Sequence, residues 1–404
     1  MTQLGSKKSR KGCAQCKKRR VKCNENAPCS NCVRRAEQCS LLYPASPSGP
    51  SESTSSTDTQ EWLQDLELMH HYSHRTSRTK LGNNIRLQHV WQEHIPLEAA
   101  RHTFLMHGVL ALSALHLACT NPQEVAKYAA LCDKHQASAL ASYRHILTHI
   151  TDEVANALFA LATILSISSM TRATLKASQM EGQQYISVDS ICELLYLTRG
   201  VREVKEATGS VVSRGPFSVV LYGHALSADI QVTMSASMFA MFRELDKMIL
   251  INCPEPDQRK QCSEALRHLR DVFETIIYTY ASGSLEMGQI WRWTAMLSYD
   301  FIKMVQSEFP PALVITAHFC VATLMLRETW YISDWGKLAY DGIRLALNGR
   351  LAEYMSWCEE EIASDNAGMK FGAAAIETTG GVQDEWLSVG SRGPTPMIQT
   401  PLAE

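Results

Sequence analysis

Apolar residues recur every three to four positions over most of residues 61–360, which is the spacing of one face of an α-helix. Clear examples are the runs FLMHGVLALSALHLA, VANALFALATILSI, SMFAMFRELDKMILI, EALRHLRDVFETIIYTY and PALVITAHFCVATLMLRETWYI. The alternation typical of strands is scarce, and only PFSVVLY near Phe217 is ambiguous. About 300 residues can bury a substantial core, so we predict one large all-helical domain over residues 61–360.

Two segments of different composition flank this predicted domain. Residues 44–60 are rich in Pro, Ser and Thr and carry few apolar residues, so we expect a flexible tether there. Residues 361–404 are Gly-rich and end in RGPTPMIQTPLAE, a composition typical of a disordered tail. Next to the tether, Asp58 followed by Glu61 resembles a capping box, which predicts that the first helix of the domain begins there.

The most apolar run of the chain, residues 154–170, is interrupted by several polar residues and is shorter than the roughly 20 residues that a bilayer requires. We therefore predict a buried helix and no membrane span. The first residues, MTQLGSKKSRKG, are charged and lack the apolar core of a secretory leader. We expect a reducing, intracellular compartment, in which disulfides are disfavoured and bound metal is favoured as the role of clustered cysteines.

A ladder of cysteines lies near the start of the chain. Six of the 13 cysteines are separated by gaps of two, six, five, two and six residues: Cys13, Cys16, Cys23, Cys29, Cys32 and Cys39. The two halves, CAQCKKRRVKC and CSNCVRRAEQC, repeat the same two-then-six spacing, which predicts two similar half-units, each a short helix followed by an extended return. The other seven cysteines lie singly in apolar stretches, as buried reduced thiols do.

Structural zinc takes four ligands in a tetrahedron. Two zinc ions require eight ligand positions, and six sulfurs can fill eight positions only if two of them bridge both metals. So small a module has little core, and the metal must supply its folding free energy, about 10 to 16 kcal/mol per structural zinc in related small domains.

This ladder resembles the zinc binuclear cluster (two zinc, six cysteine) at the N-terminus of many fungal transcription factors. The resemblance implies that residues 1–43 form a zinc-dependent DNA-binding domain with Pro28 in the loop between the halves. It also implies two bound Zn²⁺ ions, with the bridging thiolates at Cys13 and Cys29, one site completed by Cys16 and Cys23, and the other completed by Cys32 and Cys39.

Charge is unevenly distributed along the chain. The whole sequence has 39 Lys plus Arg against 41 Asp plus Glu, but residues 1–42 hold 11 of these cations and only two of the acids. A small, strongly positive segment on an acidic body is typical of a protein that binds a polyanion. A solvated charge run or a nuclear import signal is the simpler interpretation of KKRRVK, and we expect nuclear import to use it, but import does not require cysteines that fix its geometry.

The first six-residue gap, KKRRVK, holds five cations, whereas the second, VRRAEQ, holds two and an acid, so we expect the first helix to read the DNA groove. Arginine pairs bidentately with the O6 and N7 atoms of guanine. By the family resemblance, the base contacts come from Arg19 and Arg20, and guanine-containing half-sites of the CGG type are expected. The other predicted DNA-binding residues contact phosphates, which positions the protein on the duplex but does not select a base sequence. These residues are Lys17, Lys18, Lys22, Arg34, Arg35, Arg10 and Lys11.

The body also resembles a known group. WLQDLELMHHY and PALVITAHFCV, the latter followed by Trp330 and Trp335, are similar to the C-terminal domain of the sterol uptake control branch of these regulators. The resemblance implies a helical regulatory domain that responds to a small, sterol-like apolar effector, and a gene set in secondary metabolism or in sterol and lipid metabolism. From the residues alone, we expect the aromatic and Met side chains to serve ordinary core packing.

Several alternatives remain open at the sequence level. The tether has no heptad pattern, so the choice between monomer and homodimer is open. His70 and His74 lie one helical turn apart and could share a metal, but no third ligand is evident, and we favour a partly exposed helix face. No GxSxG, HExxH, Walker or GxGxxG signature occurs, so we predict no enzyme. The leading hypothesis is a nuclear, sequence-specific transcription factor for RNA polymerase II genes, and the alternative is a ligand-sensing or scaffold protein with only nonspecific DNA affinity.

Overall fold

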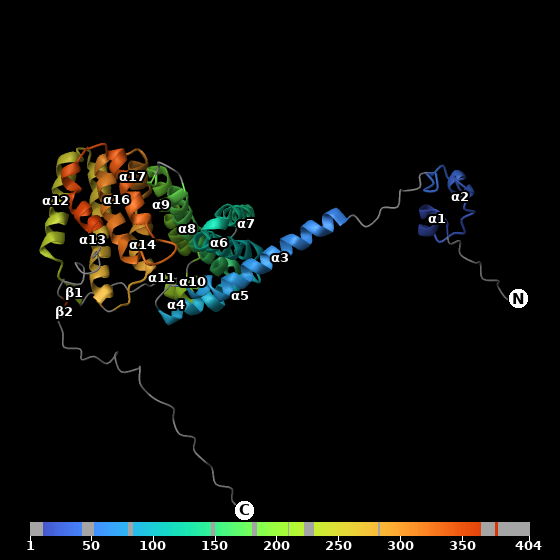
Figure 1. The fold of residues 1–404 in the computed structure, drawn as a ribbon, viewed down its shortest axis with the longest axis horizontal. Helices are drawn as coiled ribbons and strands as arrows, with labels where there is room; N and C mark the ends of the chain where they lie inside the picture. The colour runs from blue at the N-terminus through green and yellow to red at the C-terminus, as the bar shows by residue number, and fades with distance from the viewer. Residues whose placement is uncertain are drawn as a thin grey trace, which may run out of the picture. The chain divides into compact units, whose positions relative to one another are not determined.

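The chain divides into two compact units, Met1–Leu66 (unit 1) and Glu67–Glu404 (unit 2) (Figure 1). The structure is a computed structural model, and it describes residues 11–42, 52–79, 84–146, 150–179, 184–208, 210–221, 230–281, 283–364 and 376–378.

Unit 1 contains two short helices, α1 (Ala14–Lys18) and α2 (Ser30–Val33), and the first part of a long helix, α3 (Glu52–His74). Helix α3 begins inside the predicted tether, residues 44–60, so the predicted helix start at Asp58 is wrong. The last proline of the tether is Pro50, neither Pro nor Gly occurs again before Gly82, and Ser and Thr cost a helix only a few tenths of a kcal/mol each. Residues 43–51 lie outside the described residues, and a flexible tether there stays a prediction.

Unit 2 is built almost entirely of helices. Its first half contains η1 (Thr76–Arg78), α4 (Ile85–His89), the π-helix η2 (Val90–His94), α5 (Ile95–Ala99), α6 (Thr103–Thr120), η3 (Pro122–Glu124), α7 (Val125–Ile146), α8 (Asp152–Gln179), α9 (Val188–Ala207), α10 (Ser210–Arg214) and α11 (Ser218–Leu221). Its second half contains α12 (Ala236–Asn252), α13 (Pro256–Ala281), α14 (Met287–Met296), α15 (Tyr299–Gln306), α16 (Pro310–Thr323), η4 (Leu324–Leu326), α17 (Trp335–Leu347), η5 (Ala352–Tyr354) and α18 (Ser356–Ala363).

The predicted fold class, a small cysteine-rich module followed by a large helical domain, is confirmed. A short antiparallel ribbon departs from the all-helical expectation: β1 (Ile230–Val232) pairs with β2 (Ile376–Thr378), with Ile230 opposite Thr378. Strand β2 lies inside the tail that was predicted to be disordered. The rest of that tail from residue 365 onward lies outside the described residues.

Three helices form the interior of unit 2. Helices α6, α8 and α16 are apolar on nearly all faces and are largely buried, as a helix without a polar face must be. By length and composition, α6 and α8 could each cross a membrane, and α15 together with the segment Pro310–Leu326 passes the same test as a pair bent by 100°. In the most apolar windows of α6 and α8, however, 72% and 83% of the residues are buried inside the protein, so the predicted buried helix over residues 154–170 is confirmed.

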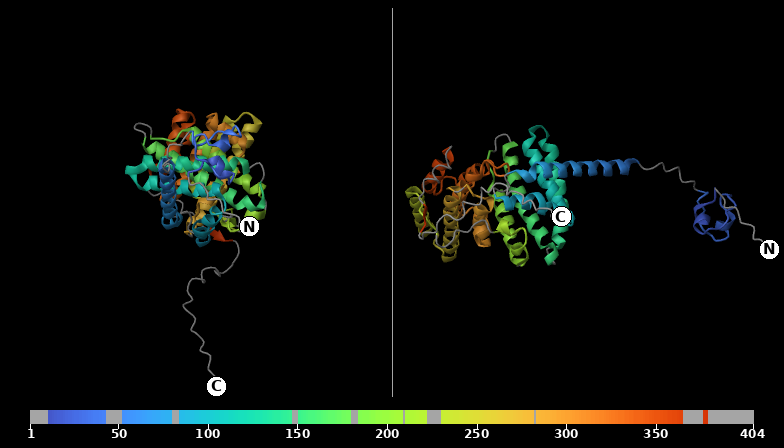
Figure 2. Two further views of the ribbon diagram at one scale, coloured as in Figure 1. Left: turned by 90° about the vertical axis from the view of Figure 1, so that its right-hand side faces the viewer. Right: turned by 90° about the horizontal axis from the view of Figure 1, so that it is seen from below.

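The helices pack in an order that follows the chain. Helix α6 lies along α7 and α8, α8 lies along α9, and α9 contacts α14 and α15, while α13 and α17 pack against α16. Figure 1 and the right view of Figure 2 show the green helices α8 and α9 between the teal α6 and α7 and the orange-red α16 and α17. This arrangement brings α8, α9, α11 and α14, which are far apart in the sequence, around one cavity.

Candidate metal centre and nucleic-acid interface

The two halves of the cysteine ladder have the same local geometry. Cys13 caps the N-terminus of α1, and Cys29 occupies the same position before α2. The amide of Cys13 donates to Sγ of Cys23 at 3.4 Å, and the amide of Cys29 donates to Sγ of Cys39 at 3.3 Å. Each half is therefore a helix that begins at its CxxC pair and then returns, as the repeated spacing predicts.

The turn that follows each helix is repeated as well. Arg20 and Ala36, each four residues after the second cysteine of its half, have φ values of 56° and 51°. The next amides, those of Val21 and Glu37, donate to the carbonyl oxygens of Cys16 and Cys32 at 3.1 and 3.0 Å. A left-handed residue costs about 1 kcal/mol when it is not glycine. Left-handed residues at these two equivalent positions turn each half of the module back toward the sulfurs, and Glu25, between the halves, has a φ of 60° as well.

The sulfur atoms lie at distances that fit shared zinc. Sγ of Cys13 is 3.6 Å from those of Cys29 and Cys32, and Sγ of Cys29 is 3.6 Å from that of Cys16. Tetrahedral zinc with bonds of about 2.3 Å places its sulfur ligands about 3.8 Å apart. All six cysteines are at most 3% exposed. Cys13 and Cys29 each lie 3.6 Å from two cysteine sulfurs of the opposite half, and their assignment as the bridging thiolates stays a prediction.

The thiols differ in acidity for physical reasons. Burial raises the pKa of Cys16 to about 12, and burial also raises the pKa of Cys29. The amide of Cys29 lowers the pKa of Cys39 to about 7, and the amide of Cys13 lowers the pKa of Cys23. Zinc binds thiolates, so the metal must displace protons from the buried sulfurs, and its own charge compensates for theirs.

The predicted DNA-binding cations do not share one environment. Most of them are exposed: Lys11, Lys17, Lys18, Arg20, Lys22, Arg34 and Arg35. Arg10 lies outside the described residues. Arg19 is different, because its side chain is only 24% exposed and its Nη2 lies 2.9 Å from Oε2 of Glu37. Its Nε donates to the carbonyl oxygen of Gln15 at 3.3 Å, and Nη2 also lies 3.9 Å from Sγ of Cys32.

Sequence reasoning missed the role of Glu37. This residue is the acid of the second six-residue gap, VRRAEQ, and its side chain holds the Arg19 guanidinium across the two halves. The lone acid in that gap was the available signal, but nothing in the spacing identified its partner.

Residues 11–48 match the domain family described as the fungal Zn(2)-Cys(6) binuclear cluster domain. The N-terminal module is therefore a fungal Zn2Cys6 binuclear cluster domain. Such a cluster holds two zinc ions, which confirms the predicted cofactor, and the family is one of transcription factors and not of enzymes.

Relatives extend the similarity beyond the cluster domain. The Zn(2)-C6 fungal-type transcription factor afumD of Aspergillus fumigatus is 32% identical over 224 residues, which cover 52% of this chain and 57% of that protein. A Zn(2)-C6 fungal-type transcription factor of Gibberella zeae is 23% identical over 81% of this chain and 80% of its own length. Sterol uptake control protein 2 of Candida albicans is 35% identical over 116 residues, which are 29% of this chain and 16% of that protein.

Among the described residues, His70 and His74, two of the three histidines of α3, belong to no group of three or more metal-ligating side chains. His70 and His74 are exposed, their rings stack with centroids 4.2 Å apart, and Nδ1 of His74 lies 3.1 Å from the carbonyl oxygen of His70. Within the described ranges, the group of three or more metal-ligating side chains that the structure brings together is Cys13, Cys16, Cys29 and Cys32.

Proposed function

We propose that this chain is a sequence-specific DNA-binding transcription factor that acts in the nucleus on RNA polymerase II genes. The observation that carries the proposal is the cluster of buried sulfurs surrounded by exposed cations, because it gives a small module both a fixed shape and a positive surface. Phosphate neutralisation supplies affinity for any duplex, whereas a rigidly held arginine or lysine can select a base.

The residues divide into three proposed roles. Bound zinc cross-links the two halves, so the exposed residues at the end of α1 are held in fixed positions. Arg20 is the second residue after α1, is exposed, and is the proposed reader of guanine in a CGG-type half-site. Arg19 braces the two halves through Glu37 in addition to any DNA contact. The proposed phosphate contacts are Lys11, Lys17, Lys18, Lys22, Arg34 and Arg35, with Arg10.

The gene set is proposed from the relatives. The similarity to sterol uptake control protein 2 supports a pathway-specific regulator of sterol genes, and we extend the proposal to lipid and secondary-metabolite genes. Transcript levels in a deletion strain test this assignment, because a pathway regulator changes one coherent set of biosynthetic genes. An unchanged transcript profile for such genes contradicts it.

Selection from randomised duplexes with the zinc-loaded full chain tests the DNA-binding proposal. We expect one guanine-containing site to bind about a thousandfold more tightly than random duplex. If every duplex binds equally, the alternative holds, namely a ligand-sensing or scaffold protein with nonspecific DNA affinity. The number of chains on the selected duplex separates a monomer from a homodimer, since half-site spacing follows protein symmetry.

Two arginine variants separate reading from positioning. Arg20→Ala should cost about 1 to 3 kcal/mol on the selected site and relax the choice of base. Arg34→Ala, from the second half of the module, should weaken binding on all duplexes alike and lower the salt slope by about one. Equal losses on every sequence for both variants would remove Arg20 from its proposed role.

A further inference from the structure

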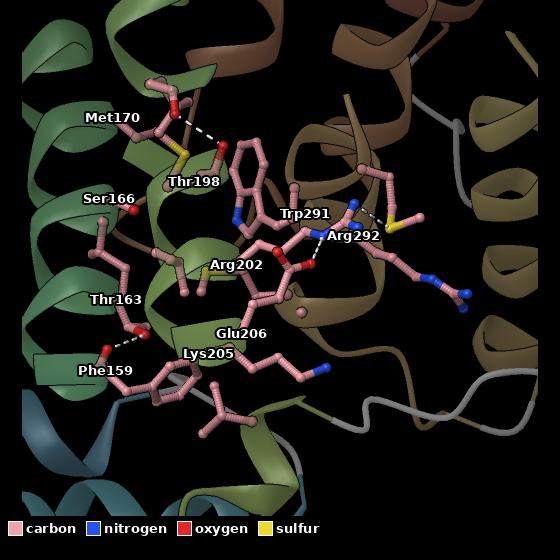
Figure 3. A pocket seen from close by; sticks show the side chains of 18 residues that line it. Phe159, Thr163, Ser166, Met170, Thr198, Arg202, Lys205, Glu206, Trp291 and Arg292 are labelled. Carbon is pink, nitrogen blue, oxygen red and sulfur yellow. Dashed lines mark hydrogen bonds and ion pairs between the residues drawn. The ribbon is translucent and has the colours of Figure 1, made fainter. Parts of the chain in front are cut away.

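A cavity of about 480 Å³ lies in unit 2 between α8, α9, α11 and α14 (Figure 3). Its size is that of a small-molecule site. Much of its wall is apolar, formed by Phe159, Ile167, Met170, Leu194, Val220 and Trp291. The hydroxyl groups of Thr163, Ser166 and Thr198 also line it, but each donates its proton to a carbonyl oxygen of its own helix, at 3.0 Å in all three cases. The wall therefore favours an apolar body.

Charged residues also line this cavity, and positive charge prevails among them. Arg202 and Lys205 lie beside one acid, Glu206, which leaves a formal excess of one positive charge, while the side chain of Arg292, which also lines the cavity, points away from this group (Figure 3). Figure 3 shows Arg202 and Glu206 side by side, with Lys205 below them. An apolar cavity with a cationic rim is complementary to an amphipathic molecule that carries an anionic group.

Arg202 has donor capacity to offer such a group. Its Nε lies 2.6 Å from Oε1 of Glu206, but its Nη1 donates to the thioether sulfur of Met296 at 3.4 Å. A thioether is a weak acceptor, whereas a guanidinium forms its strongest hydrogen bonds with oxyanions. An anionic oxygen in place of the sulfur contact would exchange a weak hydrogen bond for a charge-assisted one. The side chain of Arg202 is 32% exposed and can adjust to do so.

A neighbouring cavity determines the orientation of the ligand. This second cavity, of about 750 Å³, shares Thr163, Val220, Met287 and Gly288 with the first. It is lined by Glu286, whose Oε1 accepts a hydrogen bond from the amide of Asn84 at 2.6 Å. Arg86 lines the same cavity, so one acid and one arginine leave no formal charge excess there. Positive charge prevails only in the first cavity, so the anionic group of a ligand belongs at Arg202, and its apolar end points toward the shared wall.

We propose that the cavity between α8, α9, α11 and α14 binds a small amphipathic organic acid, with its apolar body against Met170 and Trp291 and its anionic group on Arg202. This site is separate from the DNA-binding function proposed above. Loss of ligand binding would leave the selected DNA sequence unchanged, and failure of DNA selection would leave ligand binding unchanged.

A matched pair of fluorescent probes tests the proposal on the zinc-loaded full chain. 8-Anilinonaphthalene-1-sulfonate and N-phenyl-1-naphthylamine share one aromatic body and differ in the sulfonate. We expect the sulfonate to bind about tenfold more tightly, which corresponds to about 1.4 kcal/mol. Arg202→Met should abolish this preference and leave the neutral probe bound. Arg267→Met is the matched control, because Arg267 also pairs with an acid four residues on, Asp271, but lies outside the cavity lining.

A second set of variants locates the binding site. Ala295 lines the cavity from α14, so Ala295→Trp should fill it and exclude both probes, and Ala295→Leu should weaken both by a smaller factor. Thermal unfolding of each variant identifies any variant that fails to fold. If Ala295→Trp does not fold, probe binding to Ala295→Leu decides whether the probes occupy this cavity. Equal binding of the two probes to the wild-type protein, a preference that survives Arg202→Met, or wild-type binding in both Ala295 variants would overturn the proposal.

Discussion

Arg19, at the end of the first half of the cysteine module, pairs with Glu37 in the second half, with 2.9 Å between Nη2 and Oε2. The pair is partly exposed, so its ion-pair energy alone is below about 1 kcal/mol. Its geometry matters more, because the same Nη2 lies 3.9 Å from Sγ of Cys32 and fixes the end of α1 relative to the other half. We therefore propose that Arg19, although predicted to contact a base, acts mainly by positioning the end of α1, whereas Arg20 is exposed beside it.

This difference predicts distinct DNA phenotypes for two adjacent arginines. Arg19→Ala should weaken binding to all duplexes by less than about tenfold, because it loosens the module without removing a base contact. Arg20→Ala should change which base is preferred. Selection from randomised duplexes with each variant measures both effects, and Glu37→Gln serves as the control that releases Arg19 without altering any cation. A changed base preference in Arg19→Ala would show that its guanidinium leaves Glu37 to read DNA.

The sulfur distances predict unequal zinc losses. Sγ of Cys29 lies 3.6 Å from the sulfurs of both Cys13 and Cys16 in the opposite half, so Cys29→Ser should remove the predicted bridge and release both zinc ions. Cys39→Ser removes a terminal ligand and should leave close to one zinc per chain. Cys192→Ser, at a buried cysteine of the helical body, should leave two. Zinc per chain by elemental analysis checks the series, and one retained zinc in Cys29→Ser would argue against a bridging role.

Zinc loading should fall as the pH falls. Burial raises the pKa of Cys16 to about 12 and also raises that of Cys29, so these thiols are protonated in the metal-free module and zinc must release their protons. Each released proton makes the apparent affinity rise tenfold per pH unit in this range. Competition with a chelator of known affinity between pH 6 and 8 measures the slope. A pH-independent zinc affinity would mean that the thiolates form without the metal.

Some features of the molecule follow from its sequence, and others depend on packing. The repeated cysteine gaps were sufficient to predict the two half-units, because each CxxC pair lies at the start of its own short helix. This local structure needs no distant partner. The helical spacing of apolar residues likewise identified the large helical domain. The Arg19–Glu37 pair lies 18 residues apart and exists only once the sulfurs have closed the module.

The cavity and the ribbon were beyond sequence reasoning for the same reason. Met170 and Trp291 were expected to serve only core packing, and the space between them depends on how α8, α9 and α14 meet. Strand pairing of Ile230 with Thr378 joins segments almost 150 residues apart. Helix α3 begins before the capping pattern at Asp58 because residues 51 to 81 contain neither Pro nor Gly, so nothing in the sequence stops the helix from extending back to Glu52.

Two glycines of unit 2 should respond to alanine in opposite ways. A Cβ atom on Gly342 of α17 would lie 1.8 Å from the carbonyl oxygen of Ile186, whose amide donates to the carbonyl oxygen of Leu338 at 2.9 Å. Gly342→Ala should therefore lower the free energy of unfolding by about 3 kcal/mol. Gly200, inside α9, has no atom within 4 Å of such a Cβ, and Gly200→Ala should raise it by up to about 1 kcal/mol. Urea unfolding compares both variants with the wild-type chain, and a stable Gly342→Ala would contradict the close packing of α17 on Ile186.

His318 should make the stability of unit 2 depend on pH. This histidine is fully buried in α16, its Nδ1–H donates to the carbonyl oxygen of Val314 at 2.8 Å, and its ring stacks on Trp357. Burial lowers the pKa of His318 to about 4, against about 6.5 in an unfolded chain. Between these two values the unfolded state binds the proton and the folded state does not, so stability is retained above pH 6.5 and falls by about 3 kcal/mol as the pH drops to 4.

Replacing the imidazole tests this origin of the pH dependence. His318→Phe keeps an aromatic ring beside Trp357 and removes the titrating group, so the fall in stability between pH 6.5 and 4 should become shallower by about one proton. His116, whose pKa burial also lowers to about 4, should account for part of the remaining slope. Urea unfolding followed by circular dichroism over this pH range measures the slopes, with His74→Phe as an exposed control. Parallel stability profiles for His318→Phe and the wild-type chain would assign the pH dependence to other groups.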